Sequence, residues 1–369
     1  MKPHSSILRG AILAGLFPFI SHPLLADDSA TEINAKLEAG HEVAWLIKDS
    51  IDVDGDLAVL FAARAKNAQP AEFPYLVTGA RPVSTDATKD FDNDDATKNQ
   101  MVTENVVVSL KEKRVLGRLQ LDPWCQYFPG RNHRGLQAVW GPKENGSRFG
   151  ILDFKLRFTS GAVFIVEMNG ESTEPALTQT DIGKRVESSL DSVIKKQSQD
   201  SYSNGQADFH FRFGPERSIR VRAVATTNPK QLDSQKTFCA LFQGTFDLES
   251  KEWTASDTRP LTSKQYEAFS SAYVDISDLT KHMTVAGKPA AKNLTWSMGF
   301  SSEQQKADYL DKIMNDVYQA TRVLLTTNRF AEVKHEQIAW LKTRDAARSV
   351  TQKSKLLEER IEKLQDLLW

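Results

Sequence analysis

The sequence predicts an α+β protein in which a β-rich body of antiparallel hairpins, either a partial propeller or a sandwich, precedes a C-terminal three-helix unit. From Asn105 onward, short runs of β-type residues alternate with charged or glycine-containing turns. After Ser301, apolar residues recur every three or four positions, and neither proline nor glycine occurs there. The 369 residues leave room for more than one domain. We expect a signal peptide over 1–26, a β-rich domain with one inserted helix over 27–290, and a helical domain over 300–369.

The first 26 residues have the pattern of a secretory signal peptide. Lys2 and Arg9 give a positive start, Ala11 to Ile20 form an apolar run, and Ala26 ends a suitable cleavage site. The run is shorter than the about 20 residues that cross a bilayer, and no other stretch of the sequence is suited to it. We therefore expect a periplasmic or secreted protein, cleaved near Ala26, without a membrane span.

The body reads as a series of strands. Polar residues from Asp27 to Gly40 predict a frayed or weakly helical start, and Asp52 to Asp56 predict a turn into the apolar run Leu57 to Arg64. One helix, Asp181 to Gln197, is expected because its apolar residues share a face. Hairpins are expected at Val106–Leu110 with Val115–Leu119, Leu152–Phe158 with Val163–Met168, Phe209–Phe213 with Ile219–Ala225, and Ala240–Leu248 with Trp253.

The spacing of these hairpins resembles the blade repeats of TolB-like β-propellers, with Asn132 to Trp140 in the place of an inter-blade element. The hairpins are too few to close a ring, so a sandwich is an equal alternative. The acidic stretch Asp86 to Asp95 predicts a solvated loop. Lys281 to Lys292, which contains Gly287 and Pro289, predicts the linker to the helical domain.

Cys125 and Cys239 are the two cysteines of the chain. In an oxidising compartment they can form a disulfide, and closing so long a loop would stabilise the fold by about 4–5 kcal/mol in the chain-entropy model. Two buried free thiols are the alternative, and the sequence favours neither.

Three helices are expected in the C-terminal domain. Ser302 can cap the first and Thr326 the second. Because isolated helices of this length are marginal in water, they must pack against one another or against the body. Their expected packing residues are Tyr309, Ile313, Val317 and Leu324, then Val333, Trp340 and Leu341, then Leu357, Ile361, Leu364 and Leu368.

This region resembles the LprI-type family of lysozyme-inhibitor-like envelope proteins. The resemblance rests on Asn315 and Tyr318, on the run Gln337, Trp340, Arg344 and Asp345, and on Arg360 and Leu364. It covers about Asp308 to Asp366, under a fifth of the chain. Arg348 stands where the family commonly has a cysteine, so the disulfide between the family's helices is absent here. The resemblance implies a helical domain that binds lysozyme or another envelope protein.

The second helix carries the predicted contact face. Gln337, Trp340 and Arg344 are separated by three and four residues and therefore share one side of a helix. Tryptophan beside arginine is a frequent anchor of protein interfaces. We predict a binding surface formed by Asn315, Tyr318, Gln337, Trp340, Arg344 and Asp345. In the alternative, Trp340 fills the bundle and Arg344 pairs with a carboxylate such as Glu336, Asp345 or Asp316.

Composition and motifs argue against several classes of function. The net charge of −1 and the scattered Lys and Arg residues lack the basic footprint of a nucleic-acid-binding protein. The sequence has no nucleophile elbow, zinc-protease helix, phosphate-binding loop or dinucleotide fingerprint. We therefore expect no cofactor, no metal site and no enzymatic activity.

Three hypotheses for function follow, in order of preference. The first is an exported envelope binding protein that acts through its helical domain, with lysozyme as a candidate target. The second is a non-catalytic envelope adaptor whose β body binds a protein or peptide. The third is a hydrolase built on the β body, where Trp124 to Phe128 and Asn132 to Arg134 are the densest group of aromatic and polar residues.

Overall fold

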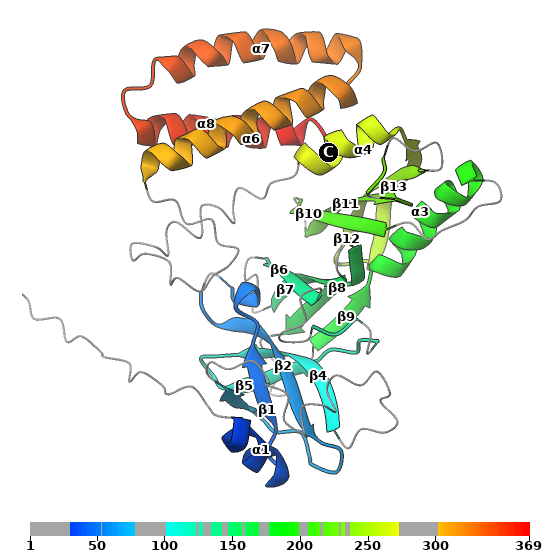
Figure 1. Cartoon of the computed structure of the whole chain (residues 1–369), viewed down its shortest axis with the longest axis vertical. Coiled ribbons are helices and arrows are strands. Elements are labelled where there is room, and N and C mark those ends of the chain that lie inside the picture. The colour runs from blue at the N-terminus through cyan, green and yellow to red at the C-terminus, as the bar shows by residue number, and fades with distance from the viewer. Residues whose placement is uncertain are drawn as a thin grey trace, which may run out of the picture.

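The computed structural model describes residues 30–52, 54–77, 101–122, 125–127, 134–141, 147–156, 159–169, 177–198, 206–214, 217–228, 230–232, 237–272 and 302–369. Within them the predicted α+β class is confirmed: three sheets are stacked in chain order, and three helices follow at the C-terminus (Figure 1). The expected signal peptide, the acidic stretch 86–95 and the linker 281–292 lie outside the described residues. No described helix has the length and apolar character needed to cross a membrane.

The first sheet has the order β3-β1-β2-β4-β5. Its strands are β1 Val43–Leu46, β2 Leu57–Ala65, β3 Tyr75–Val77, β4 Met101–Ser109 and β5 Arg114–Arg118, with a short 3-10 helix, η1, at Lys48–Ser50. All neighbours are antiparallel except β1 and β3. The polar start of the chain forms a full helix, α1 Ala30–Glu38, because Ile33 and Leu37 are buried against this sheet.

The acidic turn before β2 is confirmed as the entry to that strand. Asp52 accepts hydrogen bonds at Oδ1 from the backbone N–H groups of Asp56 (2.7 Å) and Leu57 (3.1 Å). Gly55, with φ +67°, supplies the left-handed residue that the turn needs. The other carboxylate oxygen of Asp52 lies 2.6 Å from Arg148, so the turn also ties the first sheet to the second.

The second sheet is an antiparallel meander with the order β6-β7-β8-β9. Its strands are β6 Arg134–Trp140, β7 Ser147–Leu156, β8 Thr159–Asn169 and β9 Leu177–Asp181. One face packs against the first sheet, with Leu152 and Phe154 beside Val59 and Val107. Phe149 and Ile151 of β7 face the other way and belong to a second core, because successive side chains of a strand point to opposite faces of the sheet.

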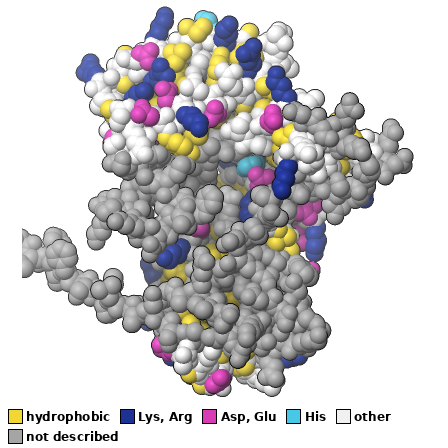
Figure 2. Space-filling view, viewed as in Figure 1, with side chains coloured by type: hydrophobic (Ala, Val, Ile, Leu, Met, Phe, Trp, Pro, Cys, Tyr) yellow, Lys and Arg dark blue, Asp and Glu magenta, His cyan; other side chains and the backbone are white. Residues whose placement is uncertain are grey.

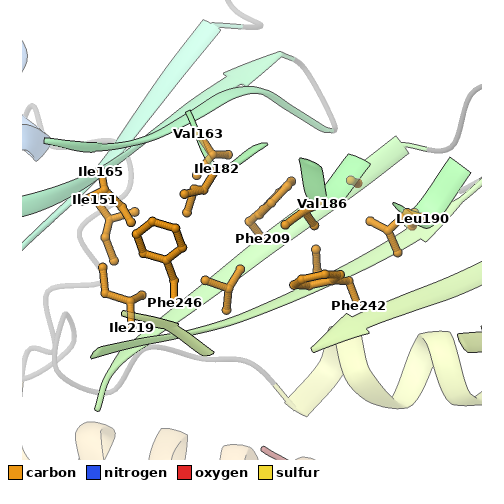
Figure 3. Close-up of a cluster of buried hydrophobic side chains, with 14 of the residues drawn as sticks. Ile151, Val163, Ile165, Ile182, Val186, Leu190, Phe209, Ile219, Phe242 and Phe246 are labelled. Atoms are coloured by element: carbon orange, nitrogen blue, oxygen red, sulfur yellow. The ribbon is translucent and has the colours of Figure 1, made fainter. Parts of the chain in front are cut away.

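The third sheet has the order β10-β11-β12-β13, all antiparallel. Its strands are β10 Gln206–Phe213, β11 Ser218–Thr226, β12 Cys239–Asp247 and β13 Glu252–Leu261, and α3 Gly183–Ser198 precedes it. Ile151 and Ile165 of the second sheet meet α3 and the third sheet in one core, in which Val186, Phe209 and Phe242 converge (Figure 3). The predicted helix and all four predicted hairpins are thus confirmed.

The described residues after β13 form the helices α4 Ser263–Ala272, α6 Glu303–Leu324, α7 Thr327–Asp345 and α8 Val350–Asp366. The hydroxyls of Ser302, Thr326 and Ser349 accept backbone N–H groups and cap α6, α7 and α8, which is worth about 1 kcal/mol each. The helical unit, defined here as α6, α7 and α8, has its own core around Leu310, Met314, Val317, Leu357 and Ile361.

Helix α4 joins the helical unit to the third sheet. Phe269 packs against Val224 and Leu241 of the sheet, while Ala268 and Ala272 pack against Ala320 and Leu368. Gln365 and Gln243 add hydrogen bonds to the backbone carbonyls of Ala272 (2.9 Å) and Leu368 (3.2 Å). The sheets, α4 and the helical unit therefore form one continuous stack.

Candidate functional site

The side of α7 that carries the predicted residues faces α6 and α8. Val333 and Gln337 are buried, and Trp340 packs partly buried against the core of the helical unit. Arg344 lies one helical turn further on the same side. The opposite side, with Lys334, Ile338 and Lys342, is exposed, and Ile338 keeps 52% of its surface accessible.

Gln337 holds the three helices together. It is 5% exposed; its Nε2 donates to Sδ of Met314 (3.1 Å), and its Oε1 accepts from Nε of Arg360 (2.8 Å). Arg360, itself buried, also pairs with Glu336 at 3.4 Å. Buried polar groups of this kind are retained when their hydrogen bonds are made. Helix α7 is therefore held against α6 and α8 partly by buried hydrogen bonds and not by apolar contacts alone.

Arg344 lies at the surface between α6 and α7. Its Nη1 donates to Oδ1 of Asp311 on α6 (2.9 Å), and its Nε and Nη2 donate to Oδ1 of Asp345 (2.9 and 2.8 Å). The guanidinium carbon is 5.7 Å from the centre of the Trp340 ring. Its side chain remains 18% exposed. Two carboxylates and a ring thus fix its orientation.

The two predicted residues of α6 are placed differently from each other. Asn315 is exposed and donates to the backbone carbonyl of Asp311 at 2.9 Å. Tyr318 is partly buried, with its ring 5.6 Å from that of Phe330. The structure therefore brings together Asp311, Asn315, Arg344 and Asp345, which we call the Arg344 rim. Gln337, Tyr318 and Trp340 lie in or beside the core.

Sequence reasoning missed Asp311, which connects the rim. Its carboxylate pairs with Arg344 and lies 3.8 Å from the ammonium of Lys353 on α8. Its backbone carbonyl accepts a hydrogen bond from the side chain of Asn315. The available signal was the i,i+4 spacing of Asp311 and Asn315 on one side of α6. On the face of the helical unit that Figure 2 shows, acidic, basic and hydrophobic side chains are interspersed rather than gathered by sign.

A second cluster of charges joins the second and third sheets. The ammonium of Lys155 lies 2.6 Å from Asp153 and 2.7 Å from Asp208, and it donates to Oγ of Ser160 at 3.3 Å. Burial lowers the pKa of Lys155, but the two carboxylates outweigh it, and the pKa is raised above its ordinary value. Lys155 therefore stays protonated at neutral pH and cannot act as a base toward Ser160.

His210 and Glu187 near this cluster have shifted pKa values. Burial lowers the pKa of His210 to about 4, against the opposing effect of Asp208 at 3.6 Å and with the help of Lys155 and Arg222. Burial raises the pKa of Glu187 to about 7, and Asp181, Asp191 and Asp153 add to the shift. Both groups are thus favoured in their uncharged forms.

The His210 shift predicts a loss of stability in acid. Its folded pKa is below the unfolded value, so its contribution is complete above about pH 6.5 and is lost as the pH falls to about 4. The full loss is about 3 kcal/mol. Glu187 acts in the opposite sense, because its contribution to the stability of the fold is lost as the pH rises from about 4.5 to about 7. Denaturant unfolding at pH 7 and pH 4 measures this effect. Between these pH values, the free energy of unfolding should fall less in His210→Gln than in the native protein. Equal falls in the two proteins would contradict the lowered pKa of His210.

The body region proposed for a hydrolase is only partly described, because residues 123, 124 and 128–133 lie outside the described ranges. Within Cys125 to Tyr127, the backbone N–H of Tyr127 donates to Asn105 at 2.9 Å, and Gln126 bonds Thr103. These polar groups fasten the segment to β4. In the described part of the chain, no three His, Cys, Asp or Glu side chains are grouped to hold a metal ion.

Of the two alternatives for the cysteines, the disulfide between Cys125 and Cys239 is not formed. The thiol of Cys125 donates to the carbonyl of Gly161 in the second sheet at 3.1 Å. Cys239 is buried on β12 of the third sheet, 3.5 Å from Oγ1 of Thr226, and burial raises its pKa. The two thiols therefore have different partners, and of the two buried thiols in the alternative only Cys239 is buried, while Cys125 is partly exposed.

No protein-family model, curated protein or solved structure matches this chain. The resemblance of the helical unit to the LprI-type family therefore stays a prediction.

Proposed function

We propose that the protein is an exported binding protein that recognises a protein partner at the Arg344 rim. The observation that carries this proposal is the guanidinium of Arg344, fixed by Asp311 and Asp345 above Trp340 and still open to solvent. Such a protein acts by occupying a partner's surface. The signal-like N-terminal segment supports its placement in the periplasm or outside the cell.

Preorganisation makes the rim suited to binding. Immobilising a free long side chain at an interface costs about 0.5–1.5 kcal/mol. For Arg344 most of this cost falls on folding and not on binding, because carboxylates from two helices already hold its side chain in the unbound protein. Gln337 and Arg360 fix the position of α7 from inside. A partner would meet a rigid guanidinium edge together with the carboxylate of Asp345, whose side chain is 65% exposed.

Lysozyme is the first partner to test, because the resemblance of the helical unit implies it. A cationic partner could also contact the carboxylate of Asp345, which binds Arg344 and whose side chain is 65% exposed. Opposite charges at an interface speed association and fix the register of docking.

The native protein should lower lysozyme-driven lysis of cell walls in a saturable, stoichiometric way. Arg344→Ala in the full chain should weaken this inhibition roughly tenfold or more, as expected for an interface hot spot. Lys342→Ala, on the exposed opposite side of α7, should leave it unchanged. Matching thermal unfolding curves would show that both variants remain folded.

Unchanged lysis at micromolar excess of the native protein would reject lysozyme as the target. Capture of partners from an envelope extract then separates the remaining hypotheses. A partner that Arg344→Ala fails to retain supports the rim. A partner that the variant retains as well as the native protein places the contact elsewhere, as the adaptor hypothesis expects of the β body.

A further inference from the structure

Within the described residues, strand β13 forms an open edge of the third sheet. It is the last strand in the order β10-β11-β12-β13, and seven of its ten residues are exposed. The adjacent strand β12 is buried at Cys239, Ala240, Leu241 and Phe242. An exposed edge of this length offers unpaired backbone groups to another strand.

The pairing of β12 shows which backbone groups of β13 face outward. The N–H of Thr227 donates to the carbonyl of Phe238, so even-numbered residues of β12 bond β11 and odd-numbered ones bond β13. The odd residues Asp257 and Arg259 pair with odd residues of β12. Ser256 and Thr258 therefore direct their N–H and C=O groups outward, and Pro260 offers only its carbonyl.

The outward N–H and C=O groups of β13 can form hydrogen bonds with the same groups of a second copy of the strand. In an antiparallel pair centred on Thr258, the two Thr258 residues exchange N–H···O=C bonds. Each Ser256 N–H then meets the carbonyl of Pro260 in the other copy. All four outward N–H groups thus find acceptors, and the missing N–H of Pro260 leaves no donor unpaired.

Charges select this register. Asp257 and Arg259 lie on one face of β13, 3.8 Å apart at their nearest charged atoms, and both are exposed. Centred on Thr258, each Asp257 lies opposite Arg259 of the other copy, at a closely spaced non-hydrogen-bonded pair. A shift by one residue either way sets Asp257 opposite Asp257 or Arg259 opposite Arg259, which is unfavourable.

We infer that two copies of this protein associate through β13, antiparallel about Thr258, and join their third sheets into one. The contact is short, because the irregular register of β12 and β13 near Thr245 and Phe246 limits it at one end and Pro260 at the other. It therefore belongs to the small, reversible class of interfaces. The Arg344 rim takes no part in it.

Sedimentation equilibrium of the full chain without its signal segment tests the inference over a concentration series. The native protein should show a reversible monomer–dimer equilibrium. Asp257→Arg and Arg259→Asp each place like charges opposite one another twice, so each should weaken the dimer roughly tenfold or more. Glu252→Lys, a charge change on the same strand outside the paired segment, should leave it unchanged.

Mixing the two single variants is the decisive measurement. One copy then presents two arginines and the other two aspartates, so a heterodimer should form about as tightly as the native dimer. A native protein that stays monomeric at every soluble concentration would overturn the inference. So would single variants that lose the dimer without recovering it on mixing.

Discussion

Replacing Lys155 by methionine is expected to lower the free energy of unfolding by about 3–5 kcal/mol at neutral pH. Lys155 is the countercharge of Asp153, whose side chain is 1% exposed and 2.6 Å away. Burial raises the pKa of Asp153, and Lys155 opposes that rise. Without the ammonium, a buried carboxylate stays in the core of the stack with no opposite charge beside it.

The pH dependence of this loss follows from the same carboxyl. In the variant, the pKa of Asp153 lies further above its unfolded value, so the protonated acid is favoured in the folded state. The loss should therefore be small in acid and should grow as the pH rises through the folded pKa. Denaturant unfolding at several pH values measures it.

Two comparisons separate this effect from a general loss of packing. Adding Asp153→Asn to Lys155→Met removes the stranded charge and should recover part of the stability. Lys184→Met changes a lysine whose side chain is 88% exposed and should stay within about 0.5 kcal/mol of the native protein. A loss below about 1 kcal/mol for Lys155→Met would mean that water reaches Asp153 freely.

The elements that could be predicted from sequence are those with a strong local period. The hairpin strands alternate clearly, as at Ile219 to Ala225, and the helical unit keeps its three-and-four spacing without proline or glycine. Strands β1, β3, β6 and β9 were not predicted. They are held by their neighbours in the sheet: β3 has three residues and pairs in parallel with β1 across a long connection. Helix α4 was not predicted because its apolar side is short, consisting of Ala268, Phe269 and Ala272. These residues are buried only because α4 lies between the third sheet and the helical unit.

The orientation of α7 shows why the candidate site could be predicted only in part. Gln337 and Arg344 are polar, so on a single helix they indicate an exposed side. Their partners, Met314, Arg360 and Asp311, come from other helices, and these contacts turn that side inward. The residues of the site were therefore recognisable by type and spacing. Which of them are accessible depends on the packing of three helices.

The junction between the helical unit and the third sheet is expected to depend most on Arg222 of β11. Arg222 is 0% exposed and is the largest fully buried side chain among the described residues. Its guanidinium carbon lies 4.9 Å from the ring centre of Phe269 on α4 and 4.6 Å from that of Trp369, which follows α8. A desolvated cation facing an aromatic ring contributes about 2 kcal/mol. One side chain therefore binds the sheet, α4 and the end of α8 together.

Arg222→Ala should destabilise the protein by about 3–5 kcal/mol, because it leaves a cavity and removes the cation from both rings. Hydrogen exchange should quicken in α4 and in the last turn of α8, while the first sheet, two layers away, should keep its protection. Arg222→Lys keeps the charge but loses the planar group and should give an intermediate loss. Asp366→Asn, which removes an exposed carboxylate paired with Arg212 at the same junction, should cost less than about 1 kcal/mol. Unchanged exchange in α4 and α8 in the Arg222→Ala variant would show that apolar contacts such as Ala272 with Ala320 hold the helical unit in place without the arginine.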